Sequence, residues 1–152
     1  GTLADSSLAA RKLGELTYGL FASPGYLALH AAPRSPADLD RHDVLSFTGG
    51  SHRSTLSLQR DGQREDMEPS PRLKANNVFA VRDAAIAGMG VAQLPLIVAT
   101  PALHEGGLQP LLADWSLPTV PVHAVFASAR YLTPKVRSFI DLAVDAMQSA
   151  SS

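Results

Sequence analysis

The residue types that could carry chemistry in this chain are few, and their spacing does not suit catalysis or metal binding. The five histidines are scattered without the H-x-x-x-H spacing of a helical metal site, and the chain contains no cysteine. Thiolate catalysis, disulfides and cysteine-ligated metals are therefore excluded. Ser51 directly precedes His52, but two neighbours in sequence do not make a nucleophile–base pair without further groups. We predict no catalytic residue, no metal site and no cofactor, and hence no enzyme.

Gly88 and Gly90 form the one glycine spacing that resembles a phosphate-binding loop. A dinucleotide fingerprint needs its glycines between a strand and the helix that follows, so that the helix amides face the phosphate. Here the order is reversed, because an apolar helical pattern ends at Gly88 and a strand pattern follows. We predict that Gly88 is a left-handed helix C-cap and that Gly90 permits a tight turn.

Asn76 and Asn77 stand where a strand pattern ends and a helix pattern begins. Either side chain could cap the helix by accepting a hydrogen bond from one of its first amides. In open α/β sheets, however, ligands bind outside the carboxyl ends of the strands. One cap explains only one asparagine, so a cap and a ligand contact both stay open for this pair.

The elements that would position these residues alternate between strand and helix patterns. We predict strands over residues 16–23, 43–47, 71–77, 91–94 and 121–128, and a short strand within 106–115. Asp61-Gly62 predicts a hairpin of 55–59 with 64–68. Helices are expected over 24–30, 35–42, 78–87 and 133–147, with a short helical turn up to about residue 104. This alternation predicts an α/β fold with at least part of the sheet parallel.

Composition narrows the function classes further. The 152 residues, 45% of them hydrophobic, suit one ordinary domain or two small lobes. Thirteen Lys and Arg against fourteen Asp and Glu give a net charge of −1, so this chain alone is not expected to bind nucleic acid. No apolar run reaches the ~18–20 residues of a membrane span, and no signal-peptide pattern opens the chain. We expect no membrane association and a cytoplasmic location.

Four stretches of the chain, taken in order, match one family pattern. They are LADSSLAARKLGELTYGLFASPGYLALHAAPRSPADLDRH, PRLKANNVFAVRDAAIAGMGVAQLP, LHEGGLQPLLADW and SARYLTPKVRSFIDLAV. Each stretch alone is a weak signal, but together and at these separations they are highly specific. The whole chain resembles the C-terminal, effector-binding part of LysR-type transcriptional regulators.

The resemblance implies a two-lobe α/β architecture similar to type 2 periplasmic binding proteins, with crossover strands at 16–23 and 121–128. Lobe two would span 16–128 and be nearly complete. Lobe one would be partial, with only residues 1–15 and 129–148 present, and residues 149–152 would form a frayed tail. The winged helix-turn-helix that precedes this domain in the family is not in the sequence, so we expect an N-terminally truncated piece.

The resemblance also implies where a small-molecule effector, often a carboxylate in this family, would bind between the lobes. The cleft residues carried over are Thr48, Gly49, Asn76, Asn77, Leu94 and Pro95. The hinge residues carried over are Ser23, Pro24, Ala127 and Ser128.

The function implied is effector sensing by a transcriptional regulator that forms homo-oligomers and contacts DNA only through its missing N-terminal region. The alternative is a solute-binding protein of the type 2 periplasmic class, which shares the lobe architecture. The patterns SPGYLALH, SPADLDRH and LTPKVRSFIDLAV are typical of the regulators and favour the first interpretation.

Overall fold

The protein is described by a computed structural model that covers residues 9–49, 55–127 and 133–150. Three residues that figure in the expectations above, Ser51, His52 and Ser128, lie outside the described residues. So do the first eight residues of the expected lobe-one remnant.

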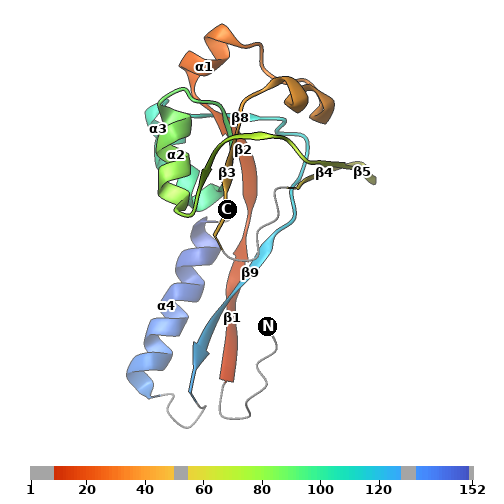
Figure 1. Cartoon of the computed structure of the whole chain (residues 1–152). Coiled ribbons are helices and arrows are strands. Elements are labelled where there is room, and N and C mark those ends of the chain that lie inside the picture. Colours follow the sequence, from red (N-terminus) through yellow and green to blue (C-terminus); the bar gives the residue numbers. More distant parts are fainter. Residues whose placement is uncertain (1–8, 50–54, 128–132, 151–152) are drawn as a thin grey trace. The chain divides into compact units, whose positions relative to one another are not determined.

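The chain divides into two compact units, which are described separately (Figure 1). Unit 2 is the continuous segment Thr17–Pro118. Unit 1 combines the chain up to Leu16 with the chain from Thr119 onward.

Unit 2 is built on a five-stranded sheet with the strand order β6-β3-β7-β2-β8. Its strands are β2 (Tyr18–Ala22), β3 (Val44–Phe47), β6 (Pro71–Ala75), β7 (Val91–Pro95) and β8 (Gln109–Leu111). β3 runs parallel to both β6 and β7, whereas β2 runs antiparallel to both β7 and β8. The expected α/β class with a partly parallel sheet is confirmed.

The predicted hairpin is confirmed as a separate two-stranded sheet of β4 (Leu56–Arg60) and β5 (Gln63–Met67). Asp61 and Gly62 form its turn with φ of 50° and 78°. Positive φ at both central residues is the requirement of the type I′ turn, which asparagine or aspartate followed by glycine meets at low cost.

The helices of unit 2 are α1 (Pro24–Leu29), the 3-10 helix η1 (Pro36–Arg41), α2 (Val78–Ile86) and α3 (Leu96–Glu105). All but α3 match the predicted ranges closely. We expected only a short turn there, but α3 is a ten-residue helix that continues through Pro101. Burial of Ala99 and Ala102 in the core stabilises it across the proline, and Gly106 ends it in the left-handed conformation with φ of 78°.

The alternation of side chains along the strands separates two hydrophobic cores. Leu20 and Ala22 of β2 belong to the core that contains Tyr26, Leu58 and Trp115. Phe21, the residue between them, belongs to the other core. That second core packs α2 and α3, which lie beside each other, against the sheet (Figure 1). Each core therefore depends on the register of the same central strands.

Unit 1 contains one antiparallel strand pair and one long helix. β1 (Ala9–Leu16) pairs with β9 (Val120–Phe126), and α4 (Pro134–Ala150) packs against β1. An ion pair of 2.9 Å joins Arg11 of β1 to Asp141 of α4, and Ile140 is 2% exposed. None of the described helices has both the length and the apolar character needed to cross a membrane.

Two expectations about unit 1 are corrected. Residues 16–23 were expected to form one crossover strand, but this range is divided: Leu16 ends β1, which pairs with β9, and β2 belongs to the five-stranded sheet of unit 2. β1 was missed because half of its residues are exposed, none is buried and several carry charge, so it lacks an apolar strand pattern. The expected fraying from residue 149 is also wrong for Ser149 and Ala150, which are the last residues of α4.

Candidate functional site

Parallel pairing brings the carboxyl ends of β6, β3 and β7 to the same edge of the unit 2 sheet. Thr48, directly after β3, donates its amide proton to the carbonyl oxygen of Ala75 at the end of β6, at 2.8 Å. β7 runs parallel to β3 on its other side and ends at Pro95. All six residues predicted to form the cleft therefore lie along this edge, which we call the carboxyl edge.

Two helices begin at the carboxyl edge. The side chain of Asn77 caps α2 by accepting the amide proton of Phe79 at 2.9 Å. α3 begins directly after Pro95, which makes no side-chain cap, and the amide of Leu96 donates to the carbonyl oxygen of Thr17 at 2.7 Å. Free amides and the helix dipole make such N-termini favourable places for an anion.

Burial separates the predicted site residues into two groups. Leu94 and Pro95 are buried, and Leu94 is part of the hydrophobic core, so these two residues stabilise the carboxyl edge by packing. Thr48, Asn76 and Asn77 are exposed. Asn77 is the cap, and within the described part of the chain the Asn76 side chain makes no hydrogen bond. The cap therefore belongs to Asn77, which uses its side-chain oxygen for it, whereas the whole side-chain amide of Asn76 is without a partner among the described residues. A ligand contact at this pair stays a prediction.

A family model described as "LysR substrate binding domain" matches residues 1–148. The chain belongs to this family. The resemblance drawn from the four sequence stretches is confirmed.

Curated relatives of this LysR domain are named as regulators of transcription. An HTH-type transcriptional regulator of Xanthomonas campestris is 34% identical over 148 residues, and CrgA of Neisseria meningitidis is 34% identical over 146 residues. PtxR of Pseudomonas aeruginosa is 36% identical over 137 residues. These matches cover 95%, 95% and 90% of this chain but 43%, 48% and 44% of the relatives. The LysR domain thus spans less than half the length of the curated proteins it matches.

Solved structures of the same family share the fold. The regulatory domain of CrgA, a LysR-type transcriptional regulator from Neisseria meningitidis, has a TM-score of 0.81 and 33% identity, over 96% of this chain and 72% of that one. The full-length Vibrio cholerae virulence activator AphB has a TM-score of 0.80 and 31% identity, over 95% of this chain and 49% of that one. The expected fold class, that of the periplasmic-binding-protein-like LysR regulatory domains, is confirmed.

One residue of the LysR domain that sequence reasoning missed at the carboxyl edge is Tyr18. It begins β2 and pairs with Pro95 at the end of the antiparallel neighbour β7. Burial raises the pKa of the Tyr18 hydroxyl. No sequence signal indicates which strand lies beside β7, so this neighbour could be found only from the sheet order.

The residues expected at the hinge lie away from the points where the chain passes between the units. Those points are Leu16–Thr17 and Pro118–Thr119. Ser23, at the end of β2 within unit 2, is 4% exposed and caps α1 by accepting the amide proton of Tyr26 at 3.1 Å. Pro24 is the first residue of α1, and Ala127 follows β9 inside unit 1. A hinge at or near these residues stays a prediction.

The glycine pair lies at the opposite, amino edge of the sheet. Gly88 has φ of 88° and follows α2, and its amide donates to the carbonyl oxygen of Ala85 at 3.0 Å. A Cβ at Gly90 would collide with the backbone carbonyl oxygen of Asp43, which accepts the amide proton of Val91 at 2.8 Å. Both glycines therefore serve the turn from helix to strand, as predicted.

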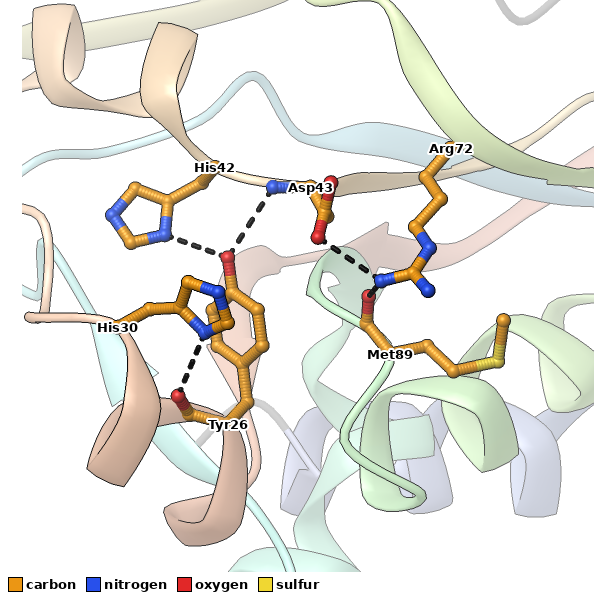
Figure 2. A network of polar contacts seen from close by, with 6 residues as sticks. All are labelled: Tyr26, His30, His42, Asp43, Arg72 and Met89. Atoms are coloured by element: carbon orange, nitrogen blue, oxygen red, sulfur yellow. Dashed lines mark hydrogen bonds and ion pairs between the residues drawn. The ribbon is translucent and has the colours of Figure 1, made fainter.

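A polar network closes the amino edge (Figure 2). The amide of Asp43 donates to the Tyr26 hydroxyl oxygen at 3.2 Å, and that hydroxyl lies 2.8 Å from Nδ1 of His42. Arg72 donates to the Asp43 carboxylate at 3.0 Å and to the carbonyl oxygen of Met89 at 3.4 Å. Burial, followed by the nearby His30, lowers the pKa of His42. Among the described residues, no group of three or more His, Cys, Asp or Glu side chains could hold a metal ion.

Proposed function

We propose that this LysR domain senses a small organic carboxylate, which binds at the carboxyl edge of unit 2. The observation that carries the proposal is the convergence of two helix N-termini with the exposed side chains of Thr48 and Asn76. The amides of the first helical turns and the positive ends of the dipoles favour a negative group. The Thr48 hydroxyl and the Asn76 side-chain amide would then orient the rest of the bound carboxylate.

Binding there would regulate transcription in the longer protein rather than catalyse a reaction. A ligand changes the balance between two conformations of a regulator only if it binds them with unequal affinity. If ligand binding changes the affinity for DNA in this way, DNA binding changes the affinity for the ligand by the same factor. DNA contact through a winged helix-turn-helix outside this chain, homo-oligomerisation and a cytoplasmic location belong to the same proposal. The names of the relatives favour it over a solute-binding protein, which would share the fold.

The proposal can be tested with Asn77→Asp, which changes the charge of the edge while keeping the cap. Aspartate caps helices as well as asparagine does, so α2 should remain intact. A negative charge at this position should repel a carboxylate and weaken its binding about tenfold or more. Backbone amide shifts of residues 48, 76, 77 and 96–98 should be followed by NMR while benzoate, salicylate and 4-hydroxybenzoate are added.

The matched control is Gln63→Glu, which adds the same charge at the exposed first residue of β5, next to the turn of the hairpin. We expect it to leave carboxylate affinity unchanged, since the turn is not part of the carboxyl edge. Equal binding by the wild type and Asn77→Asp would contradict the proposal, and so would carboxylate-induced shifts confined to other parts of unit 2.

A further inference from the structure

We propose that the segment from His30 to His42 forms a second binding site, which takes a small organic oxyanion and lies away from the carboxyl edge. The segment connects α1 to β3 and leads into the amino end of that strand. The proposed effector residue Thr48 follows the carboxyl end of the same strand. The strand therefore separates the two sites, and the second does not depend on the function proposed for the first.

The segment encloses a cavity of about 390 Å³ that is open to solvent. This volume lies in the lower part of the range of roughly 300–1,000 Å³ that is usual for small-molecule sites. The lining residues are His30, Ala31, Ala32, Pro33, Arg34, Asp38, Arg41 and His42. The cavity therefore combines a short apolar wall with two guanidinium groups.

The charges that face the cavity favour an anion. Arg34 and Arg41 contribute two positive charges, and Asp38 contributes the one carboxylate of the lining. The Asp38 carboxylate is already engaged by three donors: the amides of Arg34 and Ser35 at 2.9 and 3.2 Å, and the Arg41 guanidinium at 2.7 Å. Those donors, with the Arg34 amide the largest contributor, lower the pKa of Asp38.

Most guanidinium N–H donors of Arg34 and Arg41 remain available for a ligand. Within the described residues, the side chain of Arg34 has no ion-pair or hydrogen-bond partner, and Arg41 uses one terminal nitrogen for Asp38. Asp40 is on the same 3-10 helix but does not line the cavity, and the neighbouring Asp43 is paired with Arg72. A guanidinium with unused donors binds carboxylate or phosphate oxygens through paired hydrogen bonds.

The opposite wall of the cavity is held in place by contacts with α1. The ring of His30 stacks on the ring of Tyr26 with centroids 4.3 Å apart, and His30 Nδ1 donates to the Tyr26 carbonyl oxygen at 3.2 Å (Figure 2). Tyr26 is 2% exposed, and its hydroxyl is hydrogen-bonded to His42 at the other end of the segment. One buried tyrosine thus anchors both ends, so the cavity wall is preorganised for a ligand.

The test is an NMR titration of the chain with succinate and with succinamide, its neutral counterpart, at constant ionic strength. We expect saturable shifts of the backbone amides of residues 30–42 with succinate and none with succinamide. Arg34→Gln should weaken succinate binding at least tenfold, because it removes the guanidinium with the most unused donors. Arg34→Lys should retain part of the affinity, since it keeps the charge but loses the paired geometry.

The matched control is Arg64→Gln on the hairpin, which removes an exposed arginine that is paired with an aspartate at 2.9 Å. Its affinity for succinate should equal that of the wild type. Shifts that do not saturate, an equal loss in Arg64→Gln, or an equal response to succinamide would overturn the second site. Shifts at residues 48, 76 and 96–98 alone would also overturn it while supporting the effector site at the carboxyl edge.

Discussion

At the scale of single residues, His42 shows how one side chain can link the structure to pH. The Tyr26 oxygen accepts the Asp43 amide proton, and its own hydroxyl proton can be donated to His42 Nδ1 at 2.8 Å. This arrangement suits the neutral imidazole with its proton on Nε2. Burial favours the neutral form as well and is the main cause of the lowered pKa of His42, ahead of the effect of His30.

The free energy of unfolding should therefore fall as the pH is lowered from about 6.5, the ordinary histidine value, toward the lower pKa of folded His42. In that window the unfolded chain binds the proton more readily than the folded chain, so acid favours unfolding. Urea unfolding at several pH values between 5 and 8 measures the slope. His42→Gln should flatten it, whereas His104→Gln, which changes an exposed histidine at the end of α3, should leave it unchanged.

At the scale of elements, α2 depends on one of two adjacent asparagines. Asn77→Ala removes the acceptor for the amide of Phe79 and should lower the free energy of unfolding by about 1 kcal/mol. Asn76→Ala is the matched control and should have almost no effect on stability, because its side chain makes no hydrogen bond within the described residues. Urea unfolding of the two variants would distinguish them, and equal losses would contradict the assignment of the cap.

At the scale of the whole molecule, the exposed apolar side chains of α4 predict self-association of the chain. Phe139 and Leu142 are 69% and 67% exposed on this helix. Burial of such large, exposed apolar side chains against another surface is favourable. In the proposed homo-oligomer that surface belongs to a second copy of the chain. We expect concentration-dependent association of the chain in sedimentation velocity experiments.

Replacing both residues, as in Phe139→Ser with Leu142→Ser, should weaken this association by about tenfold or more, in line with the free energy of burying such side chains. Leu29→Ser provides the comparison, because Leu29 is 83% exposed but belongs to unit 2. Association that is weakened equally by Leu29→Ser, or not at all by the α4 variant, would count against α4 as the contact surface.

The sequence alone determined the α/β class, most elements, the hairpin turn and the family. These follow from local rules: the period of apolar residues, the special dihedral angles that Gly62 and Gly88 supply, and the order of four stretches. It also placed the N-cap of α2 at Asn76 or Asn77, but it did not decide between these two residues. Capping depends on a single hydrogen bond, and composition cannot assign that bond.

Only the tertiary structure decided which strands are neighbours and what each loop encloses. β1 pairs with a strand more than one hundred residues away, and its exposed, charged sequence carries no sign of that pairing. Tyr18 comes beside Pro95, and the ring of His42 reaches the hydroxyl of Tyr26, through packing between elements that are separate in the chain. Such contacts depend on the combined burial of many residues, so no local pattern specifies them.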